Sequence, residues 1–102
     1  MKYFIYILYS EKSQIYYVGY TTDVVQRLLR HNEISKNSFT SKHRPWILKV
    51  YFGVVGDEAD AMRIEKFIKK QKSRKFIERL IDEEVVFSEE LAKLVRVPKL
   101  RD

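Results

Sequence analysis

The chain contains no cysteine, and this absence excludes disulfide bonds and thiolate metal sites. With only three glycines in 102 residues, glycine-rich loops of the kind that bind nucleotide cofactors are excluded too. Histidines with the spacing of a zinc site are also missing. No apolar run reaches the roughly 20 residues of a membrane helix, and the first eight residues lack the layout of a signal peptide. We therefore expect a cytoplasmic protein with no membrane partner.

Acidic residues are scarce in the segment 63–79. The whole chain carries a formal net charge of +6 and has a pI near 9.5. Within this segment, eight lysines and arginines stand against Glu65 and Glu78. Such a run can be a solvated helix face, but without balancing acids it favours contact with phosphates. The residues expected to contact nucleic acid, two of them from a basic loop before Pro45, are Lys42, Arg44, Lys69, Lys70, Lys72, Arg74 and Lys75.

The spacing of apolar and turn residues predicts one domain over residues 1–96 and a tail at 97–102. Segments rich in aromatic and β-branched residues predict strands at 2–9, 15–20 and 47–55. Helical spacing and capping residues predict helices at about 24–32, 58–71, 73–84 and 89–95, with caps at Asp23, Ser73 and Ser88. The expected fold is α+β, a small three-stranded antiparallel sheet flanked by helices.

The first third of the chain concentrates side chains that can act on a phosphodiester. A phenol can take a proton from water, a guanidinium can hold phosphate oxygens and an imidazole can move a proton. We expect Tyr6 to lie directly opposite Tyr17 across a hairpin, so that both phenols share one face. Arg27 and His31 stand four residues apart on the next helix and share a face of it. Glu65, beside the apolar stripe of a later helix, is the best candidate for a metal-binding carboxylate.

Five short blocks of the sequence follow one another in a characteristic order. They are Tyr3–Leu8, Tyr16–Asp23, Arg27–Asn32, Arg44–Trp46 and Arg63–Lys69. In this order and spacing they resemble the GIY-YIG nuclease superfamily over residues 3–81. The resemblance is closest to the small stand-alone bacterial members, which are relatives of the nuclease module of a DNA-repair excinuclease. Phe4 departs from the pattern, because it stands where the family name has glycine.

The resemblance implies an endonuclease that cleaves phosphodiester bonds in DNA, in repair or recombination. It implies that one tyrosine is the general base, a role left here between Tyr6 and Tyr17 with a slight preference for Tyr17. Arg27 would stabilise the charge that grows on the phosphate, and His31 would assist proton transfer. Glu65 matches the metal-binding glutamate of the family and implies Mg²⁺ or Mn²⁺ as the cofactor. A partner protein would supply specificity.

Several of these residues also have a structural interpretation. Glu65 can be the ion-pair partner of Lys69 one helical turn later, and His31 can be an ordinary surface histidine. Asn32 is interpreted first as a helix cap. Trp46 can stack on a base, but a core position at the start of a strand is preferred.

Two other functions stay open besides the nuclease. The first is a nucleic-acid-binding module on the same fold that does not cleave, which Phe4 in the first triplet keeps under consideration. The second is a protein-interaction adaptor whose basic helices dock an acidic partner. Cleavage of plasmid DNA with a divalent metal separates the nuclease from both.

Overall fold

In the part of the chain that the structure describes, the organising element is a sheet of four antiparallel strands. The structure is a computed structural model, and the residues described are 1–34, 39–82, 87 and 89–97. The strand order is β2-β1-β3-β4, which leaves β2 and β4 at the edges. The strands are β1 (Tyr3–Ser10), β2 (Ile15–Thr21), β3 (Trp46–Val54) and β4 (Leu94–Arg96). The α+β class and the antiparallel sheet are confirmed, with one strand more than expected.

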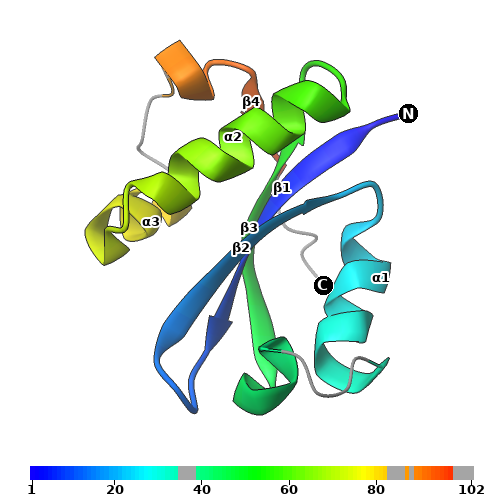
Figure 1. The fold of residues 1–102 in the computed structure, drawn as a ribbon, viewed down its shortest axis with the longest axis vertical. Coiled ribbons are helices and arrows are strands. Elements are labelled where there is room, and N and C mark those ends of the chain that lie inside the picture. The colour runs from blue at the N-terminus through cyan, green and yellow to red at the C-terminus, as the bar shows by residue number, and fades with distance from the viewer. Residues whose placement is uncertain (35–38, 83–86, 88, 98–102) are drawn as a thin grey trace.

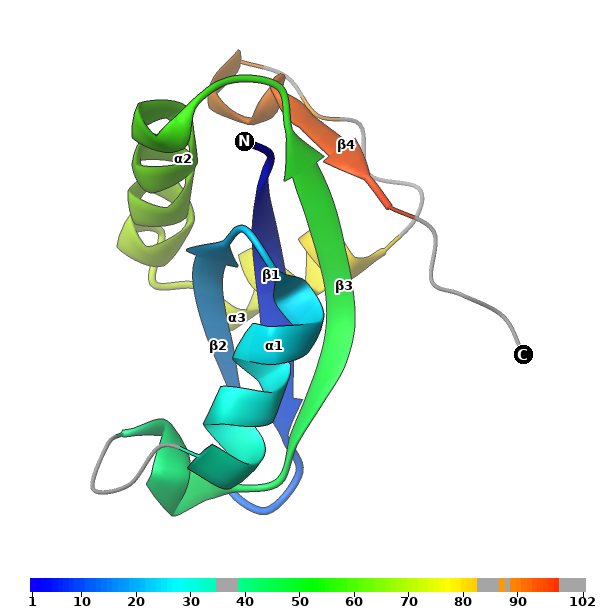
Figure 2. The same ribbon diagram turned by 90° about the vertical axis from the view of Figure 1, so that its right-hand side faces the viewer.

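Helices cover both faces of this sheet (Figures 1 and 2). The helices α2 and α3 lie on one face, while α1 and the π-helical turn η1 that continues it lie on the other. The elements are α1 (Val24–Leu29), η1 (Arg30–Ile34), the 3-10 turn η2 (Thr40–His43), α2 (Glu58–Lys70), α3 (Arg74–Ile81) and the 3-10 turn η3 (Glu89–Leu91). Among the helices described, none is long and apolar enough to cross a membrane.

Short polar side chains start the three α-helices. Asp23 and Ser73 each accept a hydrogen bond from the backbone N–H three residues further on, at 3.0 and 3.1 Å, as expected. Asp57 and Asp60 form a reciprocal capping box at the start of α2. Gly56 precedes this box with φ 153°, and a Cβ there would collide with the Asp60 carboxylate. Glycine is therefore required at the entry to α2.

The β1–β2 hairpin pairs in a different register from the expected one. Leu8 lies opposite Tyr17, and Tyr6 lies opposite Gly19, so the direct pairing of the two tyrosines was wrong by two residues. The reason is a four-residue turn at 11–14, in which the Ser13 N–H donates to the Ser10 hydroxyl. Because side chains alternate with period two, a two-residue shift keeps both phenols on one face. The shared face is therefore confirmed.

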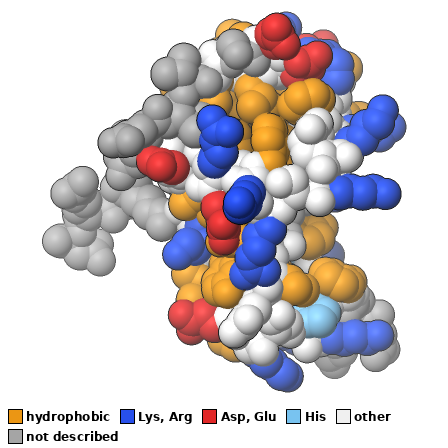
Figure 3. Space-filling view, turned by 90° about the vertical axis from the view of Figure 1, so that its left-hand side faces the viewer, with side chains coloured by type: hydrophobic (Ala, Val, Ile, Leu, Met, Phe, Trp, Pro, Cys, Tyr) orange, Lys and Arg blue, Asp and Glu red, His pale blue; other side chains and the backbone are white. Residues whose placement is uncertain are grey.

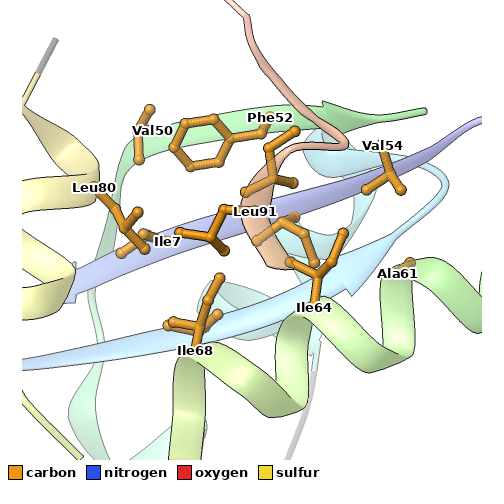
Figure 4. Packing of buried hydrophobic residues seen from close by; sticks show 12 residues of the cluster. Ile7, Val50, Phe52, Val54, Ala61, Ile64, Ile68, Leu80 and Leu91 are labelled. Atoms are coloured by element: carbon orange, nitrogen blue, oxygen red, sulfur yellow. The ribbon is translucent and has the colours of Figure 1, made fainter. Parts of the chain in front are cut away.

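Each face of the sheet carries its own apolar cluster. Between the sheet and α2, α3 and η3, aliphatic side chains such as Ile7, Ile64 and Leu80 pack around Phe52 with almost no solvent exposure (Figure 4). The cluster on the α1 face is smaller and contains aromatic and polar groups. Its buried members are Tyr6, Leu8, Val24 and Trp46. The apolar stripe expected on the helix that carries Glu65 is formed by Ala61, Ile64 and Ile68 of α2, and all three are buried.

The helix expected at 89–95 was wrong. Only Glu89–Leu91 forms a 3-10 turn, and Leu94–Arg96 pairs with Phe52–Val54 of β3 as the edge strand β4. Leu94 is buried and Val95 is exposed, which is the alternation of a half-buried strand. Pairing with the edge of β3 satisfies backbone groups that a short isolated helix would leave to water.

The side chain of Arg96 reinforces this pairing. Its guanidinium lies 5.1 Å from the centroid of the Phe52 ring and donates to the carbonyl of Leu80, 2.8 Å away, near the C-terminal end of α3. The spacing of residues in the sequence does not indicate a contact of Arg96 with Phe52 or Leu80, so the strand was not predicted. Ser88, expected as a cap, lies outside the described residues, as do 98–102 of the expected tail.

Two other helix boundaries differ from those expected. Regular α-helix in α1 ends at Leu29 rather than near residue 32, because the π-helical turn η1 takes over. The segment 33–43, expected to be a loop, contains the end of η1 and the 3-10 turn η2. For α3, the helix ends at Ile81, and the expected continuation to 84 runs into residues outside the described ones.

Candidate active site

A cavity of about 370 Å³ lies at the C-terminal end of the edge strand β2, where α1 and α2 approach that strand. Side chains from β1, β2, α1 and α2 line it together. Four of the five residues predicted to act in catalysis or metal binding are in its wall, namely Tyr6, Tyr17, Arg27 and Glu65. The fifth, His31, does not line the cavity but contacts two residues that do, Tyr6 and Tyr17.

Tyr6 is fully buried in the middle of β1 and points its phenol toward the cavity across β2. The residue opposite it is Gly19, where a Cβ would lie 2.5 Å from the Tyr6 hydroxyl. Glycine therefore leaves the space that this phenol occupies. The hydroxyl lies 2.9 Å from Nε2 of His31, which is the hydrogen bond that fixes its direction. Burial raises the pKa of Tyr6, the neighbouring Tyr17 adds to this, and the charge of Arg27 opposes it.

His31 is buried, with only 6% of its surface exposed, so its interpretation as a surface histidine was wrong. Burial first, and then the positive charges of Arg27, Arg30 and Arg44, lower the pKa of His31 to about 4. The imidazole is therefore neutral near pH 7. Its Nδ1 has no hydrogen-bond partner in the described part of the chain.

Tyr17 stands beside Tyr6 with its ring partly exposed. The two ring centroids lie 6.3 Å apart, and the Tyr17 ring meets the imidazole of His31 edge-on at 4.9 Å. Burial raises the pKa of Tyr17, and the negative charge of Glu65 raises it further, while the charge of Arg27 opposes both effects. Both phenols thus stay protonated in the free protein unless a cation enters the cavity.

Arg27 and Glu65 line the cavity from helices on opposite faces of the sheet, α1 and α2 (Figure 2). Asp23 caps α1, so Arg27 falls one turn inside the helix and its side chain reaches the cavity wall. Glu65 lies on α2 between the buried positions of its stripe, with 20% of its side chain exposed. One cation and one carboxylate therefore border the two phenols, an arrangement that can hold a phosphate on one side and a metal on the other.

The donor set of the cavity fits a metal that keeps most of its waters. Among the described residues, no group of three or more histidines, aspartates or glutamates is placed to hold a metal. This excludes a cage of protein ligands from that part of the chain. Glu65 is a single carboxylate in an open cavity, and Mg²⁺ commonly takes one or two carboxylates and completes its shell with water and substrate phosphate. The residues present are compatible with Mg²⁺ or Mn²⁺ bound in that way.

Comparison with known proteins gives the family of the chain. The family model described as the GIY-YIG catalytic domain matches residues 2–78. This chain belongs to the GIY-YIG family. It is also 35% identical over 80 residues to UPF0213 protein SH2523 of Staphylococcus haemolyticus, covering 76% of this chain and 95% of that protein. The UPF0213 protein in the ldhD 5' region of Pediococcus acidilactici is 31% identical over 86 residues, which cover 82% and 86% of the two chains.

The two GIY-YIG triplets have a clear structural meaning in this chain. In each, the middle residue, Ile5 or Val18, enters the aliphatic cluster, while a tyrosine of each triplet turns to the cavity face. Phe4, at the position of the family glycine, packs edge-on against Tyr51 at 5.8 Å and does not line the cavity. The aromatic ring at this position therefore leaves the site open.

The residues predicted to contact nucleic acid fall into two groups. Five lysines of this set are exposed on and around α2, α3 and η2; they are Lys42, Lys69, Lys70, Lys72 and Lys75. Figure 3 shows basic side chains spread over one face of the molecule, with a few acidic side chains among them. The two arginines are engaged within the fold. Arg44 donates from Nε to the backbone oxygen of His31 at 2.6 Å. Arg74 donates to the Gln14 carbonyl at 2.7 Å and stacks on Tyr16 at 5.3 Å.

Three further residues shape the site. The amide of Asn32 bridges the backbone of Trp46, so it ties η1 to the start of β3 instead of capping a helix. Trp46 is buried and donates to the Thr40 carbonyl, in agreement with the preferred core position. Glu58 lines the cavity and accepts a hydrogen bond from Tyr20 at 3.0 Å. Its spacing of seven residues, two helical turns, before Glu65 was the available signal.

Proposed function

We propose that this GIY-YIG protein is a divalent-metal-dependent endonuclease that hydrolyses phosphodiester bonds in DNA during repair or recombination. The observation that supports the proposal is the meeting of Tyr6, Tyr17 and Arg27, from three consecutive elements, with Glu65 of the distant helix α2 in one cavity. These groups supply a proton acceptor, a phosphate clamp and a metal ligand. An open cavity at the sheet edge gives a polymer access to them.

Arg27 is assigned to the phosphate. Its fork of parallel N–H groups matches two phosphate oxygens, and its charge stabilises the additional negative charge of the transition state. The same charge favours the phenolate forms of Tyr6 and Tyr17. Arg27 therefore serves both the substrate and the base, and its removal affects binding and turnover together.

The base is assigned to the tyrosine pair, with His31 as the group that receives or returns the proton. The hydrogen bond between the Tyr6 hydroxyl and Nε2 of His31 provides a path for this transfer. His31 is a weak base in the free protein because burial and three arginines lower its pKa to about 4. A bound phosphate places a negative charge close to His31 and raises the proton affinity of its imidazole. Because Tyr6 makes the hydrogen bond to His31, it is favoured over Tyr17 as the tyrosine that passes a proton to His31.

Glu65 is assigned to Mg²⁺ or Mn²⁺, with water filling the positions that the protein leaves open. When bound, such a metal supplies positive charge that polarises the phosphoryl group and stabilises the leaving oxygen. The isosteric amide of glutamine would keep the packing of α2 and remove the charge. Glu65→Gln is therefore the variant that separates metal binding from folding.

The deciding experiment is nicking of supercoiled plasmid with Mg²⁺ or Mn²⁺. Wild-type protein should convert the plasmid to the nicked form, and Glu65→Gln, purified in the same way, should not. Glu90→Gln is the matched control, since Glu90 is exposed in η3 and does not line the cavity. A contaminating nuclease would give equal cleavage in all three preparations. If wild-type protein binds nucleic acid but cleaves none, the non-catalytic binding module replaces the nuclease.

A further inference from the structure

Lys69 contacts two groups of the cavity that the proposed function uses. Its Nζ lies 3.7 Å from Oε1 of Glu65, one turn back on α2, and 5.4 Å from the centroid of the Tyr17 ring. Glu58, the other carboxylate in the cavity wall, instead accepts a hydrogen bond from Tyr20. The ammonium of Lys69 therefore rests beside the one cavity carboxylate that is assigned to the metal.

The contact between Lys69 and Glu65 is suited to exchange rather than to permanent pairing. The Lys69 side chain is 48% exposed and that of Glu65 is 20% exposed. Exposed lysine–carboxylate pairs contribute little to stability, because water and salt screen them. A divalent cation carries twice the charge and binds a carboxylate oxygen directly. The flexible four-carbon stem of Lys69 lets the displaced ammonium turn toward a phosphate nearby.

We propose that Lys69 is a positioning residue that competes with the divalent cation for Glu65 in the free protein and moves to a substrate phosphate when the cation binds. This inference rests on the metal role that the proposed function gives to Glu65. Glu65 then pairs either with Lys69 or with the divalent cation. Metal binding releases Lys69 for a phosphate, and a phosphate that holds Lys69 frees Glu65 for the metal, so metal binding and nucleic-acid binding each favour the other. The exchange keeps the metal affinity of the free protein low and raises it where a phosphate is present.

The first test measures Mn²⁺ binding without nucleic acid, by the electron paramagnetic resonance signal of free Mn²⁺. Lys69→Met should bind Mn²⁺ about 3- to 10-fold more tightly than wild type, because a competing and repelling charge is gone. Methionine keeps the apolar stem and the helix propensity. Lys66→Met is the matched control, since Lys66 is exposed and follows Glu65 directly, and neighbouring residues on a helix do not face each other. Its affinity should stay within about 2-fold of wild type.

The second test measures DNA affinity in EDTA, by fluorescence anisotropy of a labelled duplex of about 20 bp, long enough to cover the basic surface. Glu65→Gln should strengthen binding in the wild-type background, because it frees Lys69 for a phosphate. In a Lys69→Met background the same substitution should give a clearly smaller gain. A double-mutant cycle of this kind isolates the coupling between the two side chains from the general effect of removing a negative charge.

The outcomes distinguish this inference from the proposed function. If wild type binds Mn²⁺, Glu65→Gln does not and Lys69→Met binds no more tightly than wild type, the metal site stands and the competition is wrong. If Lys69→Met and Lys66→Met gained Mn²⁺ affinity equally, the gain would come from the loss of positive charge in general. That result would also overturn the competition between Lys69 and the cation. If Glu65→Gln binds Mn²⁺ as well as wild type, the metal site of the proposed function fails and this inference fails with it.

Discussion

The two faces of the sheet are made from alternate residues of the same strands, and they differ in the side chains that they bury. Toward α2 and α3, residues such as Ile5, Ile7 and Val18 enter a buried cluster of mostly aliphatic side chains that includes Phe52. Toward α1, Tyr6 and Tyr17 meet a buried histidine and the guanidinium of Arg27. One face stabilises the fold through apolar burial, while the other holds polar groups whose pKa values are displaced.

Substitutions on the two faces should therefore affect different properties of the protein. A side chain removed from the aliphatic face leaves a cavity in a close-packed layer, so the cost appears in folding. A hydroxyl removed from the α1 face changes little volume, so the cost appears in proton transfer or phosphate binding.

Ile64→Ala should destabilise the fold by about 3 to 4 kcal/mol, because Ile64 is fully buried between α2 and the sheet. Unfolding in urea, followed by circular dichroism, measures this. Met62→Ala is the matched control on the same helix, because Met62 is 42% exposed, and it should cost no more than about 0.5 kcal/mol. Similar losses in both variants would mean that α2 is not anchored by its buried stripe.

Tyr17→Phe should fold normally and nick plasmid about 100-fold more slowly, since only a hydroxyl at the cavity is lost. Tyr6→Phe should lose activity to a similar extent and also about 1 kcal/mol of stability, because the imidazole of His31 loses its partner. Tyr16→Phe is the control, since Tyr16 packs against the other face and its hydroxyl donates to the exposed Glu78. If Tyr16→Phe also lost nicking activity, the general base could not be assigned to the tyrosines of the α1 face.

The stability of the α1 face should depend on pH through His31. Burial and the nearby arginines lower the pKa of His31 to about 4, below its ordinary value of about 6.5. Between these values the unfolded chain binds more protons than the folded one, so stability rises with pH. As the pH falls from about 6.5 to 4, the wild type should lose on the order of 2 kcal/mol through this group.

Urea unfolding at one pH near the folded-state pKa of His31, about 4.5, and at another above its unfolded value, about 7.5, tests this dependence. His31→Gln should show a smaller difference between the two conditions, because the group that must protonate on unfolding is absent. His43→Gln is the control, since His43 lies only partly buried in η2 and bonds to Ser13. An unchanged pH dependence in His31→Gln would show that the imidazole does not titrate abnormally.

Much of this architecture could be predicted because its causes are local. The strands around Tyr6 and Tyr17 follow from aromatic and β-branched residues, and the starts of α1 and α3 follow from the caps Asp23 and Ser73. The direction of Glu65 follows from its place beside the apolar stripe of α2. Local chemistry therefore indicated which residues would line the cavity.

The parts that could not be predicted depend on contacts between distant segments. The sequence around His31 does not indicate that its ring is buried, because the ring contacts come from Tyr6 and Tyr17 in the hairpin. Arg44 bonds to the backbone oxygen of His31 from beyond a loop. The register of the hairpin was wrong by two residues, because it depends on the four-residue turn at 11–14, whose geometry the residues between the strands did not fix in advance. Leu94–Arg96 became a strand because the edge of β3 was available. Tertiary contacts decided each of these cases.

The smallest expected effect concerns the exposed lysines at and just beyond the C-terminal end of α2. Neutralising Lys69, Lys70 and Lys72 together should reduce the slope of log affinity for duplex DNA against log salt by about 2 to 3, since each lost phosphate contact contributes about 0.9. Neutralising Lys2, Lys49 and Lys93, which lie around β1, β3 and β4, is the control of equal charge and should leave the slope near the wild-type value. Fluorescence anisotropy across a salt series measures both. Equal slopes in the two triple variants would show that net charge alone determines binding. An unchanged slope in the first would move the nucleic-acid contact to Lys42, since Arg44 already donates within the fold.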